Sequence, residues 1–400
     1  MPRLSGGVLW LAALLPLGAG PPDAIAIRGA RVVTVSGGVI DSGTVLLRDG
    51  LIEDAGANLP IPKDAWLIEG EGLVVYPGLF DALSTIGIPE PAAPPEAASG
   101  RGQAAPAAAA AASGPEDRPS NTSWLRAADL ISPRERRIEA GREAGFTTAA
   151  VFPTQGIFAG QGAVINLAGS RAGEMIVASP VGLYLNLSTP GSQSSFPNSL
   201  MGVLAYIRQV SLDADHYQLA RAHYQRQPRG AKRPAYDRAI EGLLDAPRAL
   251  LPASRAVDIE RVLRFAAGLR FPPVLYGAHE AYAAAEAIAR AKTPVLVSLK
   301  WPERSRDEDS ERVDSLRALE LRDRAPSAPA ALARAGVAFA FYSDGVAARE
   351  VKKNVRRAMA AGLSESDAVR AMTLAPATIY GLADRLGSIE KGKIANLVVT

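Results

Sequence analysis

Hydrophobic and polar positions change their period along this chain, and the change divides the chain into regions. From residue 25 to residue 75, short runs rich in β-branched residues alternate with glycine-containing turns, which is the pattern of consecutive β-strands. Asp49-Gly50 favours a two-residue hairpin turn within this region. We expect strands at residues 26–35, 44–48, 51–54, 66–69 and 73–76.

Beyond residue 76, strand-like runs alternate with helical patterns, as in a barrel of parallel strands surrounded by helices. Apolar residues at helical spacing predict helices at residues 133–144, 200–227, 351–361 and 364–372. Ser364 and Asp367 form a capping-box-like start for the last of these helices, just after Gly362. We expect barrel strands at residues 73–82, 145–152, 163–167, 182–187, 271–277, 294–299 and 337–342.

Residues 89–123 interrupt this alternation with proline, alanine, glycine and serine in low-complexity order. Such a composition predicts a mobile loop, here placed over the mouth of the barrel. The alternative is an alanine helix at residues 107–112, which is too short to persist alone.

The first residues are typical of a secretory leader: Met-Pro-Arg, an apolar run at residues 8–17, and then Gly-Ala-Gly. The run is about half of the ~20 residues that span a bilayer. We assign residues 1–24 to a signal peptide and expect export to the periplasm or the exterior, with no membrane span apart from the leader. The alternatives are a buried N-terminal helix and an uncleaved leader kept in the membrane.

Composition removes several classes of function. The formal net charge is +3, and Lys and Arg are interspersed with Asp and Glu, so we expect no nucleic-acid partner. The chain has no cysteine, which excludes disulfides, thiolate metal ligands and a nucleophilic thiol.

Of the three histidines, His216 and His223 lie two helical turns apart, about 10 Å along the axis. That separation is too large for one ion and favours a solvated helix face.

Residues 77–87 read Pro-Gly-Leu-Phe-Asp-Ala-Leu-Ser-Thr-Ile-Gly. This stretch resembles the first barrel strand of the amidohydrolase superfamily, which ends Asp-x-His-x-His and binds metal through both histidines. Residues 386–399 resemble the closing segment of the family, and Ser343-Asp344-Gly345 resembles its Ser-Asp turn after the eighth strand. The resemblance covers most of residues 25–400, and it is to the imidazolonepropionase-like or dipeptidase-like branch.

The resemblance implies an α/β fold with two parts. One is a TIM-like (β/α)8 barrel over residues 76–385, and the other is a small β-sandwich built from residues 25–75 together with residues 386–400. Members of the family continue for further strands, so we expect the sandwich to be incomplete where the sequence stops at Thr400.

The family implies a divalent metal, such as zinc, that polarises the scissile carbonyl and activates a bound water. In this chain Leu83 and Thr85 occupy the two histidine positions of the first strand, and Pro252 occupies the third histidine position, in residues 250–254. Leucine and proline offer no lone pair, and a threonine hydroxyl is a poor ligand for zinc-like ions. We therefore expect no metal and no other cofactor.

Asp344 is the catalytic candidate of this chain. The resemblance gives its carboxylate the roles of proton shuttle and metal ligand, and a turn at the end of a barrel strand places it at the mouth, where a general base would act. The alternative is a turn-capping aspartate bonded to nearby backbone N–H groups. Asp81 precedes the replaced histidine pair, and we expect it to form structural hydrogen bonds rather than bind metal.

Four further residues are candidates for substrate binding. His279 and Glu280 follow the expected sixth strand, where a histidine could contact substrate or act as a base assisted by a carboxylate. Lys300 and Arg304 follow the expected seventh strand and could form a charged floor beside Trp301 for an anionic or amide-bearing ligand. The alternatives are a neutral histidine at a helix start and a salt-bridged loop.

Two classes of function remain. The first is a hydrolase that acts on C–N bonds of cyclic amides or small peptide-like substrates, with little or no metal-dependent activity because the ligands are replaced. The second is a non-catalytic ligand-binding protein, or a partner subunit of an intact amidohydrolase. Whether the chain is an enzyme stays open between them. In both cases we expect a small-molecule ligand, and a homo-oligomer or a heteromer.

Overall fold

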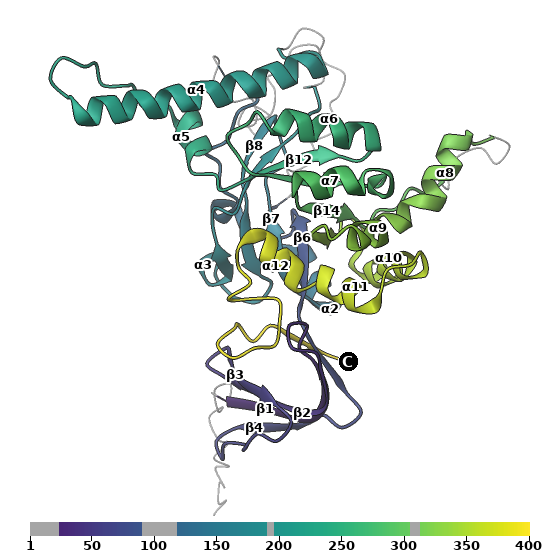
Figure 1. The fold of residues 1–400 in the computed structure, drawn as a ribbon. Helices are drawn as coiled ribbons and strands as arrows, with labels where there is room; N and C mark the ends of the chain where they lie inside the picture. The colour runs from purple at the N-terminus through teal and green to yellow at the C-terminus, as the bar shows by residue number, and fades with distance from the viewer. Residues whose placement is uncertain (1–23, 90–117, 190–195, 305–312) are drawn as a thin grey trace, which may run out of the picture.

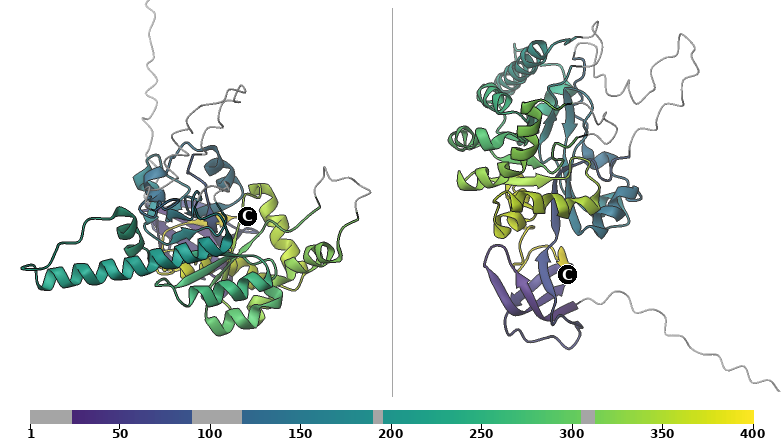
Figure 2. Two further views of the ribbon diagram at one scale, coloured as in Figure 1. Left: turned by 90° about the horizontal axis from the view of Figure 1, so that it is seen from above. Right: turned by 90° about the vertical axis from the view of Figure 1, so that its right-hand side faces the viewer.

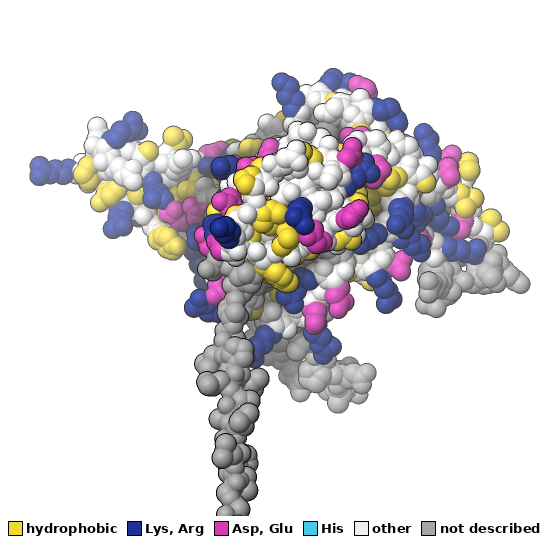
Figure 3. All heavy atoms as spheres, turned by 90° about the horizontal axis from the view of Figure 1, so that it is seen from below, with side chains coloured by type: hydrophobic (Ala, Val, Ile, Leu, Met, Phe, Trp, Pro, Cys, Tyr) yellow, Lys and Arg dark blue, Asp and Glu magenta, His cyan; other side chains and the backbone are white. Residues whose placement is uncertain are grey.

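The computed structural model describes residues 24–89, 118–189, 196–304 and 313–400, and shows a small sheet beside a larger α/β body (Figure 1). The expected leader, residues 1–24, lies outside the described residues apart from Ala24, which begins the first strand. In the view from below, acidic, basic and apolar side chains are interspersed over the face of the molecule (Figure 3).

The small sheet joins the two ends of the chain. Its strand order is β16-β5-β1-β2-β3, and β4 pairs with β1. Asp49 and Gly50 have φ values of 53° and 75°, as the predicted hairpin turn between β2 and β3 requires. The described residues form one sheet here, and its strands are β1 (Ala24–Val33), β2 (Val39–Arg48), β3 (Leu51–Gly56), β4 (Trp66–Glu69), β5 (Val74–Pro77) and β16 (Leu397–Val399).

The strand expected at residues 73–82 is two strands, because the chain crosses from one sheet to another at Gly78. β5 pairs with β1 of the small sheet, whereas β6 (Leu79–Ser84) pairs with β7 of the body. A Cβ atom at Gly78 would lie 2.1 Å from the Thr147 hydroxyl oxygen, so only glycine fits this crossing.

The body contains two sheets. One has the order β10-β9-β7-β6, and the other has the order β15-β14-β13-β12-β11-β8. Neighbouring strands from β11 to β15 are parallel, as are β6 and β7. The remaining strands are β7 (Phe146–Val151), β8 (Phe158–Gln161), β9 (Ala163–Asn166), β10 (Ile176–Ala178), β11 (Leu183–Leu185), β12 (Ala249–Ala253), β13 (Pro273–Gly277), β14 (Val295–Ser298) and β15 (Phe339–Tyr342).

The expectation of parallel strands throughout is wrong at β8 and β9. These two strands follow each other around Gly162, and they pair antiparallel with β11 and β7, respectively. Residues 152–157, which connect β7 to β8, are too few for a parallel crossover, which takes a dozen residues or more. The short connection therefore reverses the chain and links the two sheets of the body.

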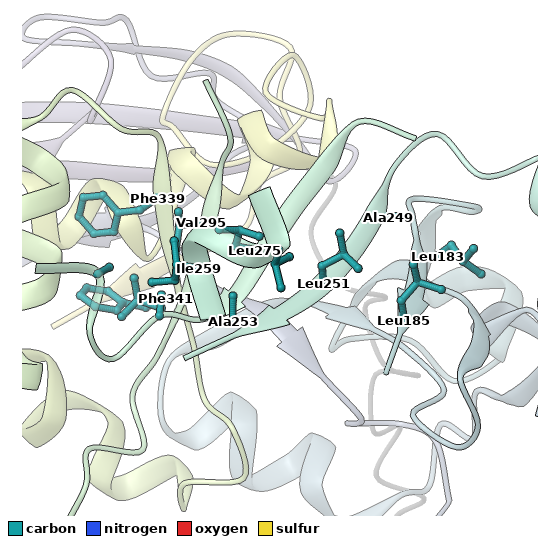
Figure 4. Close-up of a cluster of buried hydrophobic side chains, with 14 of the residues drawn as sticks. Leu183, Leu185, Ala249, Leu251, Ala253, Ile259, Leu275, Val295, Phe339 and Phe341 are labelled. Atoms are coloured by element: carbon teal, nitrogen blue, oxygen red, sulfur yellow. The ribbon is translucent and has the colours of Figure 1, made fainter. Parts of the chain in front are cut away.

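Side chains alternate between two apolar clusters along the strands. Leu183, Leu251, Leu275 and Val295 share one cluster with buried side chains of the helices, and Figure 4 draws them together with Ile259 of α6 (Ala256–Ala266). The alternate residues form an inner cluster that takes side chains from both sheets of the body, because successive strand residues point to opposite faces. That inner cluster includes Phe80, Ala82, Ala150, Phe152, Leu250, Val274, Leu296 and Ala340, and Leu83, the neighbour of Ala82 near the end of β6, also packs in it.

Helices cover the outer side of the six-stranded sheet of the body, β15 to β8, and α4 extends past the rest of the body at one end (Figures 1 and 2). The Ser364 hydroxyl accepts a hydrogen bond from the backbone N–H of Asp367 at 3.1 Å, which confirms the predicted helix start. No helix among the described residues has the length and apolar character to cross a bilayer. The α-helices are α2 (Arg136–Glu143), α3 (Ala172–Met175), α4 (Leu200–Arg226), α5 (Arg238–Leu244), α6 (Ala256–Ala266), α7 (Ala285–Ala291), α8 (Leu316–Arg324), α9 (Ala328–Arg334), α10 (Ala348–Ala360), α11 (Glu365–Ala371) and α12 (Leu374–Tyr380).

The last part of the low-complexity segment is packed and not a loop over the mouth. Residues 90–117 lie outside the described residues, but residues 120–123 are buried. The backbone N–H of Thr122 donates to the carbonyl oxygen of Phe158 at 2.8 Å, and the Ser123 hydroxyl donates to the carbonyl oxygen of Ala239. Thr122 thus satisfies a backbone group of β8, which ends the six-stranded sheet of the body, and Ser123 satisfies one in α5 (Arg238–Leu244).

Candidate functional site

A cavity of about 360 Å³ lies at the carboxyl ends of β6, β13 and β15, which is the size of a small-ligand pocket. Segments far apart in the sequence line it, because parallel strands bring their carboxyl ends to one edge. The polar and charged residues that line it include Asp81, Ser84, Thr85, Arg137, Thr154, Tyr184, Tyr276, Tyr342, Ser343 and Asp344.

Asp81 ties the end of β6 to the end of β15. Its side chain is 1% exposed, and its carboxylate accepts hydrogen bonds from the backbone N–H of Ser343 at 2.9 Å and from the Ser343 hydroxyl at 2.6 Å. Burial raises the pKa of Asp81 to about 6, although the hydrogen bonds from Ser343 act in the opposite direction. Both oxygens are engaged, which confirms the structural role expected for this residue.

Asp344 lies at the rim of the cavity, on the turn that follows β15. Its φ of 50° is in the left-handed region, which a residue of this type adopts at little cost in a turn. One carboxylate oxygen accepts a hydrogen bond from the Ser298 hydroxyl at 2.7 Å. Among the described residues, the other oxygen has no hydrogen-bond donor and Asp344 has no ion-pair partner. The turn therefore presents an open carboxylate to the cavity.

Three tyrosines, which the sequence did not single out, line the cavity beside Asp344. Tyr184, Tyr276 and Tyr342 come from β11, β13 and β15, so they occupy every second strand of the sheet. The rings of Tyr184 and Tyr276 stack with centroids 5.1 Å apart, and the Tyr276 hydroxyl donates to the carbonyl oxygen of Leu185 at 3.2 Å. Burial raises the pKa of all three, and the charge of Asp344 adds to the shift. The phenols are therefore neutral at physiological pH.

The positions of the family's metal ligands do not offer a metal-binding donor set. Leu83 is 6% exposed and packs in the inner apolar cluster, and Pro252 pairs with Tyr276 in the strand ladder. The Thr85 hydroxyl accepts a hydrogen bond from Arg137 Nη1 at 2.8 Å. The part of the chain that the structure describes has no group of three or more His, Asp or Glu side chains that could hold an ion. The hydrocarbon of Leu83 and Pro252, and the Thr85 hydroxyl that already accepts a hydrogen bond from Arg137, are not suitable ligands for a zinc-like ion.

Arg137 of α2 fixes the segment that follows β6. Its Nη2 donates to the carbonyl oxygens of Thr85 at 3.1 Å and Ile88 at 2.8 Å, and its Nε donates to Glu135 at 3.0 Å. Glu135 also accepts from the backbone N–H of Gly87 at 3.1 Å. Burial opposes ionisation of Glu135, but these hydrogen bonds outweigh it and lower its pKa. The guanidinium of Arg137, which is paired with Glu135, thus lies beside Thr85, the second of the replaced histidine positions.

His279 and Glu280 do not line the cavity with Asp344. His279 is half-buried, its ring lies 6.0 Å from that of Trp301, and burial lowers its pKa although the charge of Asp344 opposes this. Its Nε2 is buried without a hydrogen-bond partner among the described residues. The Glu280 carboxylate accepts from the backbone N–H of Ala256 at 2.9 Å and from Arg317 at 3.0 Å, so it caps α6.

Lys300 and Arg304 are exposed beyond β14 and also do not line the described cavity. Between them, Trp301 is buried and its indole N–H donates to the carbonyl oxygen of Asn354 at 2.9 Å. The structure therefore brings Asp344 together with tyrosines, and the four proposed substrate-binding residues do not line that cavity, although His279 lies near enough to Asp344 to feel its charge. His216 and His223 are exposed on α4, as expected.

The carboxyl-terminal third of the chain matches the model of a known family. Residues 266–400 match the model described as "Amidohydrolase family". No curated protein sequence matches the chain.

Three solved structures are similar over nearly the whole chain. An amidohydrolase from Thermotoga maritima MSB8 is 28% identical with a TM-score of 0.76, over 94% of this chain and 93% of that one. A prolidase in complex with N-methylphosphonate-L-proline is 16% identical with a TM-score of 0.54, over 94% and 92%. A Xaa-Pro dipeptidase with bound methionine is 13% identical with a TM-score of 0.54, over 94% and 93%. At these identities, the last two support the fold alone.

Proposed function

From the premise that this chain belongs to the amidohydrolase superfamily, we propose that it binds a small amide or peptide-like molecule at the carboxyl ends of its strands and has little or no metal-dependent activity. The observation that carries this proposal is the contact between Thr85 and Arg137. It puts a paired cation beside a position where the family requires a neutral imidazole, while Asp344 still faces a cavity of ligand size.

The residues around the cavity support binding more than hydrolysis. As a general base Asp344 would take the proton of a water, but in the family an ion also activates that water and polarises the carbonyl, and no donor set for an ion lies beside Asp344 among the described residues. Neutral tyrosine hydroxyls can donate to a carbonyl or accept from an N–H group, which suits an amide. A hydrolase acting on C–N bonds other than peptide bonds, and a partner subunit of an intact amidohydrolase, are the alternatives that the experiments below separate.

We also propose that residues 76–385 form a closed barrel with its third strand reversed. Two observations support closure: the hydrogen bonds from Ser343 to Asp81 link β15 to β6, and one inner cluster takes side chains from both sheets. Residues 25–75 and 386–400 then form the accessory sheet domain, and a leader at residues 1–24 would direct the protein out of the cytoplasm. N-terminal sequencing of exported protein tests the leader.

Metal content and ligand binding test the proposal together. Purified protein is measured by elemental analysis and then titrated, by calorimetry, with N-acyl amino acids, dipeptides and cyclic amides, with and without added zinc. We expect less than stoichiometric metal, saturable binding of at least one compound, and no turnover. Stoichiometric zinc, iron or manganese accompanied by hydrolysis would show that the chain is an active hydrolase. Co-purification of an intact amidohydrolase would favour the partner-subunit alternative.

A matched pair of variants on α10 places the binding in the cavity. Ala347 lines the rim at the start of α10, and Ala360 lies exposed at the other end of the same helix. We expect Ala347→Trp to fill the entrance and weaken binding at least tenfold, and Ala360→Trp to leave it within twofold. Equal affinities of the two variants would place the ligand elsewhere.

A further inference from the structure

We propose that the cavity recognises the positively charged head of its ligand, a compact organic ammonium group, through the carboxylate of Asp344 and the tyrosines around it. This inference rests on the proposed binding function and names the class of ligand. It follows from the charges at the cavity, from the aromatic rings beside Asp344, and from the apolar surface that completes the wall.

Three charged residues line the cavity, and Asp344 is the one whose carboxylate has an oxygen without a hydrogen-bond donor among the described residues. Arg137 is paired with Glu135, and Asp81 uses both of its oxygens on Ser343. Asp344 has one hydrogen bond, from Ser298, and no Lys or Arg among the described residues pairs with it. The carboxylate of Asp344 is exposed at the rim, and it attracts a cation that comes close to it. The cavity therefore favours ligands that bring a positive charge.

The tyrosines suit an ammonium group that carries alkyl substituents. Tyr184, Tyr276 and Tyr342 are neutral, and aromatic rings attract cations through their electron-rich faces while the hydroxyls supply acceptor lone pairs. All three tyrosines line the same cavity as Asp344. Tyr342 is only 5% exposed, which keeps water from competing at that side.

Apolar side chains complete the wall and argue against an ion with a hydration shell. Leu83 takes the place of a family metal ligand and lines the cavity, together with Phe146, Val346 and Val351. Hydrocarbon contacts are favourable for methyl and methylene groups and offer nothing to a hydrated metal ion. The carboxylate that the family pairs with a divalent ion is thus placed to pair with an organic monocation.

Calorimetry with three probes of the same shape tests the charge requirement. Choline carries the cation, 3,3-dimethylbutan-1-ol is its neutral carbon isostere, and 3,3-dimethylbutanoate is an anion. We expect choline to bind at least tenfold more tightly than the neutral isostere, and the anion to bind most weakly. Methylammonium, titrated alongside, separates recognition of a primary amine from recognition of a quaternary one.

Charge removal at the rim provides the second measurement. Asp344→Asn keeps the shape and the Ser298 contact, and we expect it to weaken choline binding about tenfold while the isostere stays within twofold. Asp41→Asn removes an exposed carboxylate on the small sheet, with 94% of its side chain exposed, and should change neither. The melting temperature of each variant confirms that it is folded.

The outcomes distinguish this inference from the proposed function. Equal affinity of choline and its isostere, or equal losses for both in Asp344→Asn, would overturn ammonium recognition and leave amide binding in place. Binding of N-acyl amino acids without binding of any cationic probe would do the same. If neither the cationic probes nor the amide panel bound, both proposals would be wrong.

Discussion

The two rims of the cavity, after β6 and after β15, differ in what they keep of the family pattern. The β15 rim keeps Ser343-Asp344-Gly345, whereas the β6 rim has Leu83 and Thr85 in place of two histidines. Asp81 lies on the β6 side but bonds to Ser343 on the β15 side, so this contact spans both rims. The residues that join the strands are present, and the two histidine positions of the β6 rim, which would hold an ion, are replaced. The contact that holds β6 and β15 together therefore does not depend on the residues that would bind a metal.

The strongest test of this comparison removes the contact between the rims. Asp81→Ala leaves the backbone N–H and hydroxyl of Ser343 without their partners in a buried place. We expect a loss of about 3 kcal/mol in the free energy of unfolding at pH 5, since each unpaired buried group costs about 1–3 kcal/mol. Urea unfolding followed by circular dichroism measures it. A loss below about 1 kcal/mol would mean that other contacts hold the rims together.

The buried carboxyl of Asp81 also predicts a pH dependence. Its pKa is raised from 3.8 to about 6, so between these values the folded protein binds more protons than the unfolded chain. The stabilisation is complete below the unfolded pKa and is lost as pH rises through 6, by up to about 3 kcal/mol. Urea unfolding of the natural protein and Asp81→Asn from pH 4 to pH 7 should show the difference between them change by this amount. A constant difference would contradict the raised pKa.

The sequence predicts most of the body, but not the direction of every strand. Alternation and turn residues place the strands at nearly their observed positions, and Asp49-Gly50 predicts a turn that the φ values confirm. Strand direction depends on the connections, and the length of residues 152–157 contained the signal for reversal at β8. The break at Gly78 depends on how closely Thr147 approaches, which only the packed sheets reveal.

The site is less visible in the sequence than the fold. Asp344 follows from its turn motif, because that motif is continuous along the chain. Tyr184, Tyr276 and Tyr342 have the appearance of core residues within their own strands, and only the order of β11, β13 and β15 brings them together. Arg137 lies 52 residues from Thr85, in a helix with no motif that would point to it.

Removing the guanidinium of Arg137 at the β6 rim should lower the free energy of unfolding by a smaller amount. Arg137→Met removes the hydrogen bonds to the Thr85 hydroxyl and to two carbonyl oxygens, and we expect a loss of about 1–2 kcal/mol because the side chain is partly exposed. Arg142→Met, on the exposed part of the same helix α2, is the matched control and should cost less than about 0.5 kcal/mol. Similar losses in the two variants would show that the guanidinium does not fix the β6 rim.

The smallest effect on stability is expected at the β15 rim, from Asp344→Asn. The residue is exposed, and the amide oxygen can still accept the hydrogen bond from Ser298, so we expect a change within about 0.5 kcal/mol in the free energy of unfolding. Asn also tolerates the left-handed φ of 50°, which Asp344→Val would not, so the valine variant should be less stable by about 1 kcal/mol. Urea unfolding of both variants measures this contrast. If Asp344→Asn were as damaging as Asp81→Ala, the carboxylate would be part of the architecture, and its retention would say nothing about a ligand.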